Sequence, residues 1–486
     1  MTLKITKIEI LFLTLILVAG SVFRLYRISE YMTFLGDEGR DALAVRDIVL
    51  GKHFPLIGPG TSVGSMYLGP LYYYLVAPSL WLAGFSPVGL AGEVAVIGIL
   101  TVALLWWIAR SWFGPKIGLG ISFLYAISPV VITYSRSSWN PNIMPFFALL
   151  AMYGTWLFWR RHDPRWLPVI GVCLAFVLNS HYLGLLLFPT VVIFLFLSKQ
   201  LHKSYPLLLA SVLIFILLMS PLVIFDMRHG WTNFHALVTF LTNRGNTVNL
   251  RIYKAMPNLW PIWNDLVSGL LTAQNYFLGW LLSLLLVFFT LIRLIKRQIS
   301  SQFIFTLTWL GFGLLGLGLY KQHIYIHYYG FLFPVPFLLL GFWLQSFSRR
   351  LAAQAVSVVL FILLALVNLQ HNPLKFAPNS QLVHTQKIAY FITDQTAGIP
   401  FNLALLSKNN YDAGYRYELA LLNSSNVTIH EKLTDQLFVI CEETPCHPVG
   451  NPLWEIAAFG WARIDKQWEF PWGVVVYRLV HNPTGS

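Results

Sequence analysis

Charged residues are scarce in this chain of 486 residues. Asp, Glu, Lys and Arg make up 11% of it, hydrophobic residues make up 56%, and the mean hydropathy is +0.63. A soluble globular domain carries about 25% charged residues. The shortage of charge therefore excludes an ordinary soluble protein and indicates a polytopic membrane protein.

The sequence also lacks internal repeats, low-complexity segments and any basic stripe interleaved with aromatic residues. Single-stranded nucleic acid needs such a stripe for its phosphates and bases, so we expect no nucleic-acid partner. The net charge of +13 instead lies largely in short loops between apolar runs. Basic loops of this kind face the cytoplasm and anionic lipid.

Cysteine is rare, with three residues in the whole chain. Cys173 lies in an apolar run, where we expect a buried thiol. Cys441 and Cys446 lie in a polar C-terminal region. If that region is outside the cell the two form a disulfide, and otherwise they are two free thiols; the sequence supports both alternatives equally.

Apolar runs of about 20 residues are long enough to cross the hydrocarbon core of a bilayer. Asn179–His181, between two short runs, is either a tight turn or a break within one helix. The first run continues to Tyr26 without a small-residue cleavage site, so we expect a retained signal anchor. The sequence predicts eleven spans, near residues 8–28, 88–110, 116–134, 142–160, 166–180, 183–198, 205–225, 271–293, 302–320, 326–346 and 350–369.

Basic residues set the expected orientation, because Lys and Arg concentrate in cytoplasmic loops. With eleven spans, all the basic loops fall on one side of the membrane. The N-terminus is then cytoplasmic, and the C-terminus lies outside the cytoplasm. The residues that support this orientation are Lys4, Lys7, Arg110, Lys116, Arg160, Arg161, Arg165, Lys199, Lys203, Arg293, Lys296, Arg297, Arg349 and Arg350.

We expect two domains. Residues 1–370 form a helical transmembrane domain with its first external loop at 29–87, and residues 371–486 form an extracytoplasmic α+β domain. In the second domain a helix is predicted at 381–391, and strands at 401–407, 427–430, 436–440 and 472–479.

The first external loop begins with Gly36-Asp37-Glu38-Gly39-Arg40-Asp41, directly after the first span. Two adjacent carboxylates at the mouth of a membrane segment are costly unless water, a metal or a substrate uses them. A helix is predicted at 41–50, and an interfacial helix at 67–81. The alternative reading is that Asp37 and Glu38 cap the first of these helices, and that Arg40 pairs with Asp41 or Asp37.

Other polar and aromatic residues lie at the expected external ends of spans, and we expect them to converge on the face that carries Asp37. The donor-phosphate candidates are Arg136, Arg228, Lys321, His323 and Tyr325. The candidates for a sugar or acceptor cleft are Tyr67, Tyr72, Trp139, Asn140, His181, His327 and Tyr328.

Each of these candidates has a structural alternative. Arg136 is alternatively an interfacial anchor, and His181 a hydrogen-bonded structural histidine. Asp226, Arg228 and His229 alternatively form an ion cluster at a helix end. The tyrosines at 72–74 alternatively belong to an interfacial aromatic belt.

The order of these features resembles the GT-C glycosyltransferases, especially the protein O-mannosyltransferase and lipid A aminoarabinose transferase group. The resemblance rests on Gly36-Asp37-Glu38, the 67–72 stretch, Ser138-Trp139-Asn140-Pro141 and the 327–334 segment. It implies a sugar donor linked to polyprenyl phosphate. The reaction would take place at the outer face of the cell (inner or plasma) membrane, with inversion of configuration at the anomeric carbon. Members of the group differ in whether they bind a divalent metal ion, and Asp37, Glu38 and His181 are the candidate ligands here.

Glycosyl transfer needs a base for the acceptor hydroxyl and cations for the departing phosphate. We expect Asp37 to be the base, with Glu38 orienting it or holding a metal. The acceptor class stays open among lipid, glycan and protein. The rival functions are a lipid-linked-sugar flippase and a glycan polymerase or ligase that uses a pyrophosphate-linked donor. A transporter usually carries charge near the middle of its spans, whereas these spans are nearly free of it.

Overall fold

The computed structural model describes residues 5–62, 64–242, 247–249, 251–346 and 351–482, which form two compact units. The first unit contains residues 1–26, 54–78 and 91–377, and the second contains residues 27–53, 79–90 and 378–486. The predicted division at residue 370 assigned 27–53 and 79–90 to the membrane domain. The structure groups both segments with the C-terminal residues instead.

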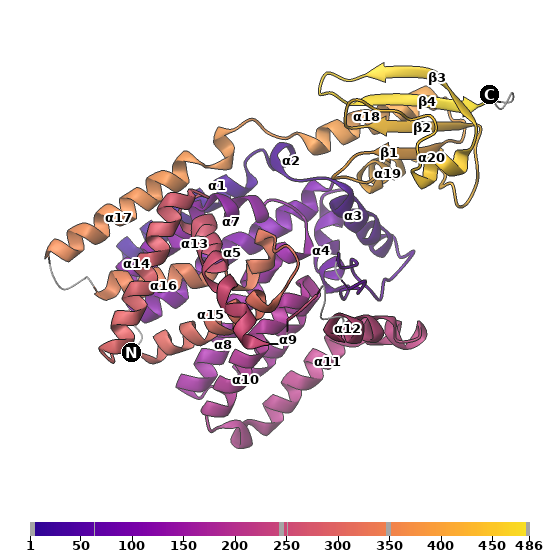
Figure 1. The fold of residues 1–486 in the computed structure, drawn as a ribbon. Helices are drawn as coiled ribbons and strands as arrows, with labels where there is room; N and C mark the ends of the chain where they lie inside the picture. The colour runs from indigo at the N-terminus through magenta and orange to yellow at the C-terminus, as the bar shows by residue number, and fades with distance from the viewer. Residues whose placement is uncertain (1–4, 63, 243–246, 250, 347–350, 483–486) are drawn as a thin grey trace. The chain divides into compact units, whose positions relative to one another are not determined.

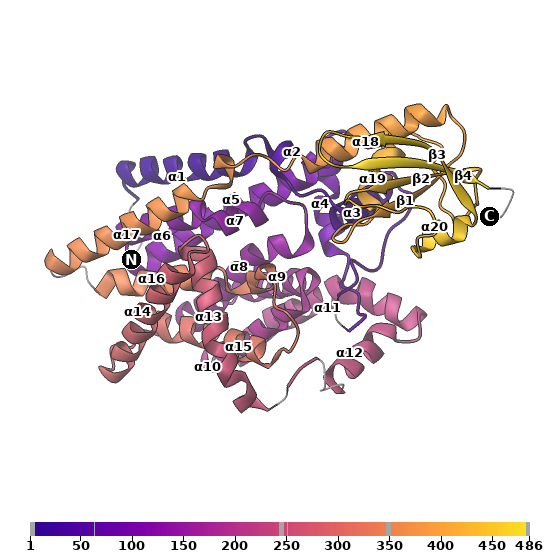
Figure 2. The same ribbon diagram turned by 45° about the horizontal axis from the view of Figure 1, so that its top comes forward.

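Where the structure describes it, the first unit consists of helices and loops, with two isolated β-bridges (Figures 1 and 2). Two helices lie across the boundary between the units: α4 (Leu71–Leu82) and α5 (Val88–Phe113). The other helices of the first unit are α1 (Lys7–Leu25), α6 (Pro115–Ile127), α7 (Pro129–Tyr134), η1 (Asn140–Ile143), α8 (Met144–Arg161), α9 (Trp166–Ser180), η2 (Tyr182–Leu187), α10 (Phe188–Leu197), η3 (Leu201–Ser204), α11 (Tyr205–Arg228), α12 (Thr232–Thr242), η4 (Ile252–Ala255), α13 (Met256–Leu271), α14 (Tyr276–Ile295), α15 (Ser301–Leu319), η5 (Ile326–Leu332), α16 (Pro334–Ser346), α17 (Leu351–Gln370) and η6 (Pro373–Lys375).

Among the described residues, six helices are long and apolar enough to cross a membrane, or seven if the bent pair η5 and α16 is one span. That pair bends by 52°. Four more apolar helices are shorter than a full span, and they overlap the predicted runs at 116–134, 166–180, 183–198 and 350–369. The structure thus shows a multi-pass helical membrane protein. The count of eleven and the orientation stay predictions, and Lys4, Arg349 and Arg350 lie outside the described residues.

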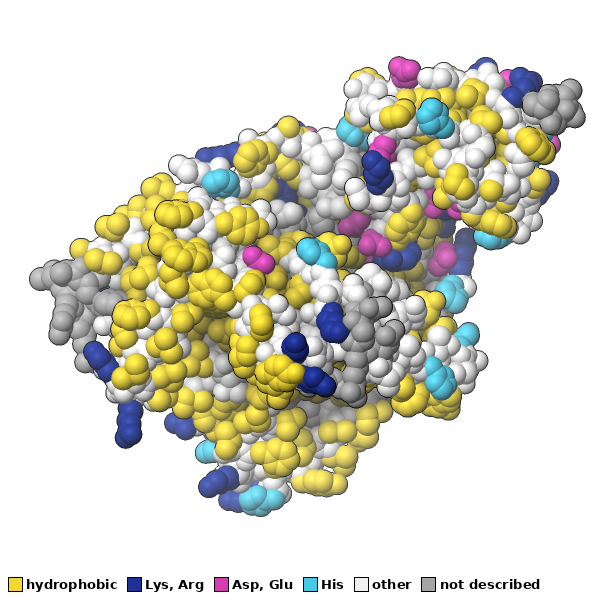
Figure 3. Space-filling model, viewed as in Figure 1, with side chains coloured by type: hydrophobic (Ala, Val, Ile, Leu, Met, Phe, Trp, Pro, Cys, Tyr) yellow, Lys and Arg dark blue, Asp and Glu magenta, His cyan; other side chains and the backbone are white. Residues whose placement is uncertain are grey.

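The surface of the first unit agrees with a lipid environment. Apolar side chains cover much of its face in Figure 3, and charged side chains there are few. Helix α11 exposes Leu213, Leu217 and Met227, although each is a large hydrophobic residue. In water such exposure is unfavourable, whereas in a bilayer the same side chains contact lipid.

The second unit is built on a four-stranded sheet in the order β1-β2-β4-β3. Strands β1 and β2 are parallel, and β4 is antiparallel to both β2 and β3. The strands are β1 (Asn402–Leu406), β2 (Gln436–Cys441), β3 (Ala462–Glu469) and β4 (Val475–His481), and the helices are α2 (Ile28–Tyr31), α3 (Gly36–Val49), α18 (Gln381–Thr396), α19 (Ala413–Leu421) and α20 (Trp454–Phe459).

Helices cover both faces of this sheet. Alternate residues of β2 point to opposite faces, so Phe438 packs with α18 and α19, and Val439 packs with α20. Every residue of β2 is therefore buried. Strand β3 at the edge is largely exposed and carries charged side chains, which discourages pairing with another chain.

The sequence-based strands fit this sheet in part. The runs predicted at 401–407, 436–440 and 472–479 overlap β1, β2 and β4. The predicted strand at 427–430 is wrong, because this segment is a loop after the single bridge between Phe401 and Asn426. Strand β3 and helices α19 and α20 were missed. The disulfide alternative for Cys441 and Cys446 is confirmed, and Cys173 is buried as expected.

Helix α3 packs against α19 through glycines. A Cβ atom on Gly39 would lie 2.2 Å from the Gly414 nitrogen, and one on Gly36 would lie 2.3 Å from the Tyr411 ring. Glycine at these positions lets two backbones approach more closely than any side chain permits. Residues 36–39 are therefore fixed against the C-terminal part of the chain.

The substitution Gly39→Ala tests this packing. Backbone atoms of Gly414 cannot yield as a flexible side chain can, so we expect a loss of about 1–3 kcal/mol of stability. Thermal unfolding in detergent, with limited proteolysis of the second unit, measures it. Gly92→Ala is the matched control, because nothing lies within 4 Å of its added Cβ. Equal melting temperatures for the two variants would contradict the close approach.

Candidate functional site

The acidic motif forms the first turn of α3, because the helix begins at Gly36 rather than at Asp41 as predicted. Two hydrogen bonds stabilise this earlier start of the helix. The Leu35 N–H donates to Glu38 Oε2 at 3.0 Å, and the Gly36 N–H donates to Asn410 Oδ1 at 2.8 Å. The first N–H groups of a helix have no partner within the helix, so side-chain acceptors stabilise this end.

Glu38 has the capping role that the alternative reading proposed. Its side chain is buried, and burial raises its pKa from 4.5 to about 7, with the Leu35 N–H opposing the shift. Adjacent Asp37 and Asp41 raise it further but contribute less than burial. A buried carboxyl group that accepts a hydrogen bond from a backbone N–H stabilises the helix start, so we assign Glu38 a structural role.

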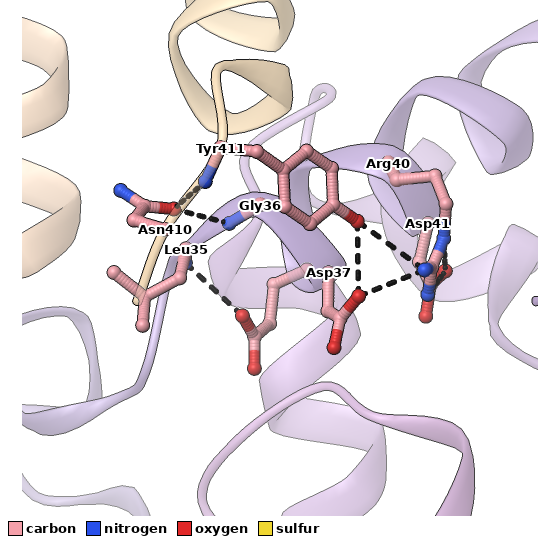
Figure 4. A network of polar contacts seen from close by, with 8 residues as sticks. Leu35, Gly36, Asp37, Arg40, Asp41, Asn410 and Tyr411 are labelled. Carbon is pink, nitrogen blue, oxygen red and sulfur yellow. Dashed lines mark hydrogen bonds and ion pairs between the residues drawn. The ribbon is translucent and has the colours of Figure 1, made fainter. Parts of the chain in front are cut away.

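Asp37 has a different environment. Its side chain is 41% exposed, and its Oδ1 accepts hydrogen bonds from Arg40 Nη1 at 2.8 Å and from the Tyr411 hydroxyl at 2.9 Å (Figure 4). Within the described residues of the second unit, its Oδ2 has no hydrogen-bond partner. Asp37 therefore presents an accessible carboxylate oxygen, as a proton acceptor requires.

Arg40 is held by Asp41, as the structural alternative expected. Its Nε and Nη2 donate to Asp41 Oδ1 at 3.0 Å and 2.7 Å, and the Asp41 side chain is fully buried. The guanidinium also lies 3.2 Å from the Tyr411 hydroxyl. Arg40 thus contacts Asp37 in a fixed orientation, although an ion pair this exposed adds only about 0–1 kcal/mol.

Residues from the 410–442 region complete this group, and the sequence reading missed them. Asn410 Nδ2 donates to both Glu442 oxygens at 2.9 Å and 3.1 Å, and the Tyr415 hydroxyl donates to Glu442 Oε1 at 2.8 Å. No local pattern marks these residues, because Tyr411 stands 374 positions after Asp37.

The other predicted site residues all belong to the first unit. Several rings lie together there: those of His181 and Tyr328 are 4.3 Å apart, those of Trp139 and His327 4.3 Å, and those of His327 and Tyr328 4.6 Å. Tyr325 lies 5.7 Å from His327 and carries a half-exposed ring. Aromatic faces with polar edges suit a carbohydrate ligand.

Tyr67 is held by a chain of hydrogen bonds. The Asp226 carboxylate accepts from Asn233 N at 2.6 Å and thereby caps the start of α12, which Figure 2 shows following α11. Asn233 Oδ1 accepts from Tyr67 N at 2.7 Å, and the Tyr182 hydroxyl donates to the Tyr67 carbonyl at 2.5 Å. Asp226 is thus a helix-end cap, and Arg228 next to it is exposed.

Four predicted ligand residues are buried, namely Arg136, Tyr72, Asn140 and Tyr328, and the first three form hydrogen bonds inside the first unit. Arg136 donates to the Tyr26 carbonyl at 3.0 Å, Tyr72 shares a hydrogen bond with Ser138 at 2.7 Å, and Asn140 donates to the Ser180 carbonyl at 2.7 Å. All three are at most 3% exposed. The structure thus gives these three side chains hydrogen-bond partners inside the first unit, and ligand roles for Arg136, Tyr72 and Asn140 stay predictions. Their polar groups serve packing within the first unit.

A cavity of about 700 Å³ opens in the first unit between α13, α15 and the 320–324 loop. Lys321 and His323, both predicted phosphate ligands, line it, together with Lys254, Asp265 and Asn258, which the sequence reading missed. Its size is within the range of small-ligand sites. The two lysines give it an excess of positive charge that suits a phosphate.

The predicted metal ligands lie in two different units, and metal binding by them stays a prediction. Asp37 and Glu38 belong to the second unit and His181 to the first. Across residues 5–482, wherever the structure describes them, no three His, Cys, Asp or Glu side chains group so as to hold a metal ion.

Comparisons with known proteins support the fold. A family model described as dolichyl-phosphate-mannose-protein mannosyltransferase matches residues 68–225. ArnT from Cupriavidus metallidurans bound to undecaprenyl phosphate superposes with a TM-score of 0.60 at 13% identity, over 96% of this chain and 97% of that chain. A search of curated protein sequences found no significant match.

A second similar structure is archaeal oligosaccharyltransferase AglB from Archaeoglobus fulgidus, in complex with an inhibitory peptide and a dolichol-phosphate. Its TM-score is 0.55 at 14% identity, over 90% of this chain and 69% of that chain. The predicted resemblance is thus confirmed: the chain has a GT-C fold and is similar to the group that contains ArnT and the protein mannosyltransferases. At these identities the structural likeness shows the fold alone.

The raised pKa values in the second unit give a pH test. Glu38 and Glu418 are buried, and burial raises the pKa of each to about 7. Between pH 4.5 and 7 the folded state binds more protons than the unfolded state, so stability falls as pH rises through this window. Ionisation of each group lowers the free energy of unfolding by about 3 kcal/mol by pH 8.

Glu38→Gln and Glu418→Gln should each remove part of this pH dependence and raise the melting temperature at pH 8 above that of wild type. Gln keeps an acceptor oxygen for the Leu35 N–H. Melting temperatures from pH 5 to 8 measure the effect, and exposed Glu469→Gln is the control. A slope unchanged in both variants would contradict the assigned burial.

Proposed function

We propose that the protein is a membrane glycosyltransferase that moves a sugar from a polyprenyl-phosphate donor to an acceptor hydroxyl outside the cytoplasm. The acceptor is a lipid, a glycan or a protein. The GT-C fold and the mannosyltransferase family model support the class. The observation that carries the proposal is the accessible Asp37 oxygen beside a buried, capping Glu38.

In this reaction Asp37 Oδ2 takes the proton of the acceptor hydroxyl. The acceptor oxygen forms a bond to the anomeric carbon, and the bond from that carbon to the phosphate oxygen breaks on the opposite face. Configuration inverts, and polyprenyl phosphate leaves with the bonding electron pair. Arg40 contacts Asp37 through Oδ1 and leaves Oδ2 to accept the proton.

We propose that the cavity with Lys254, Lys321 and His323 binds the donor phosphate. Ammonium groups stabilise the charge that grows on the phosphate as the bond breaks. The cluster of His181, Trp139, His327 and Tyr328 offers ring faces to the sugar. The exposed ring of Tyr325 lies 4.5 Å from that of His323 and connects the cluster with the cavity within the first unit.

The first test is transfer from a radiolabelled polyprenyl-phosphate sugar. Asp37→Asn should lower kcat about 10²- to 10⁴-fold, as expected for loss of a general base, while donor binding persists. Glu38→Gln should retain most activity, because Gln still accepts the Leu35 N–H. Detergent size-exclusion of each variant controls for folding.

Normal transfer by Asp37→Asn would overturn the assignment of the base. A wild type that uses only a pyrophosphate-linked donor would instead identify a glycan polymerase or ligase. Movement of lipid-linked sugar across vesicles without any transfer would identify a flippase.

The second test concerns the cavity. Lys254→Ala and Lys321→Ala should each raise the donor KM about tenfold, since a charge-assisted hydrogen bond to phosphate is lost. The Lys321 backbone N–H still donates to the Thr247 carbonyl, so the loop keeps its local contact. Lys203→Ala, at an exposed lysine of η3, is the control. Unchanged KM in the double variant would contradict phosphate binding in this cavity.

A further inference from the structure

The segment 410–411 contacts the first turn of α3 in a way that the reaction above leaves unexplained. Tyr411 and Arg40 both donate to the same Asp37 oxygen, Oδ1, at 2.9 Å and 2.8 Å. Figure 4 shows the Tyr411 ring lying along the helix start with its hydroxyl directed at Asp37. Two donors on one oxygen leave the other oxygen for a different partner.

We propose that Tyr411 is a positioning residue for Asp37, and that it orients the carboxylate so that Oδ2 meets the acceptor hydroxyl. This inference rests on the proposed function, in which Asp37 is the base. Carboxylate oxygens exchange places by rotation about a soft terminal torsion. Two hydrogen bonds to Oδ1 restrict that rotation.

The ring of Tyr411 is itself fixed. It occupies the space over Gly36, where a Cβ would lie 2.3 Å from it. Asn410 Oδ1 accepts from both Gly36 N at 2.8 Å and Tyr411 N at 2.9 Å, and it thereby joins the loop to the helix start. A residue can hold a catalytic group only if its own position is determined by packing and hydrogen bonds.

The support extends into the sheet. Glu442, which accepts from Asn410 and Tyr415, directly follows β2, and the Cys441–Cys446 disulfide closes the turn that contains it. Burial raises the pKa of the Tyr411 hydroxyl well above its ordinary value, and nearby Arg40 opposes this. Tyr411 therefore stays protonated at neutral pH and acts as a donor to Asp37.

A role for the C-terminal residues follows. They supply the donor that orients the base, in addition to any contact with an acceptor. Deleting the chain after residue 373 would remove Tyr411, Asn410 and the α19 surface that holds Gly39. Loss of activity in such a truncation therefore would not identify an acceptor-binding role, and point substitutions are needed.

The experiment compares Tyr411→Phe with wild type in the full-length protein, using a polyprenyl-phosphate sugar donor. Phenylalanine keeps the ring over Gly36 and removes only the hydroxyl. We expect kcat to fall about 10- to 100-fold, as small misplacements of reacting groups do, with donor KM within about twofold of wild type. Tyr390→Phe, at an exposed tyrosine of α18, should change neither.

The double variant Asp37→Asn with Tyr411→Phe separates positioning from an independent role. If Tyr411 acts through Asp37, the double variant is no slower than Asp37→Asn alone. A further drop comparable to that of Tyr411→Phe in wild type overturns the proposal. Wild-type kcat in Tyr411→Phe overturns it as well.

Thermal unfolding of the same four proteins gives a readout that needs no activity. Coupled hydroxyl and carboxylate groups make the two melting-temperature changes non-additive, by about 2 °C or more. Additive changes overturn the proposal. If wild type transfers no sugar from any polyprenyl-phosphate donor, the proposed function fails, while non-additive melting still supports the Tyr411–Asp37 contact; the two failures are therefore distinguishable.

Discussion

The contact between α3 and α19 is the constraint on which the acidic site depends. Gly39 and Gly414 meet backbone to backbone, and the Tyr411 ring fills the space over Gly36. This approach helps to set where α3 begins, because Asn410 accepts the Gly36 N–H at its first residue. It also buries Glu38, and burial in turn raises the pKa of that carboxyl. One steric condition thus sets the geometry of the motif and the environment of Glu38.

Two neighbouring carboxylates take opposite roles because they lie in a helix. Successive residues of an α-helix point about 100° apart, so Asp37 and Glu38 cannot face the same surroundings. Glu38 turns inward and caps the helix, whereas Asp37 turns to the side shared with Arg40, three residues later. Glu38 is therefore a buried structural group and Asp37 is an accessible carboxylate. A reaction with a single general base requires one accessible carboxylate of this kind.

The first unit uses its few polar groups in two ways. Some buried groups form hydrogen bonds inside the unit, as Arg136, Tyr72 and Asn140 do. A polar group without a partner in lipid costs several kcal/mol, so such residues form hydrogen bonds inside the protein. The second set lies at helix ends and in loops, where the cavity gathers Lys254 and Lys321 and the ring cluster gathers His181 and Tyr328. This second set contains the residues that we propose as ligands.

Composition and periodicity are local properties, so they predicted those features of the fold that depend on residues close together in the sequence. The apolar runs predicted the long helices, the alternation near residues 402, 436 and 475 predicted three strands, and the carboxylate pair marked the motif with its GT-C resemblance. The start of α3, the burial of Arg136 and the partners of Asp37 were decided by tertiary structure. Tyr411 lies 374 residues from Asp37, and the loop at 427–430 pairs through one bridge rather than a ladder. Contacts over such separations produce no recognisable pattern in the sequence, because they depend on which surfaces the folded chain brings together.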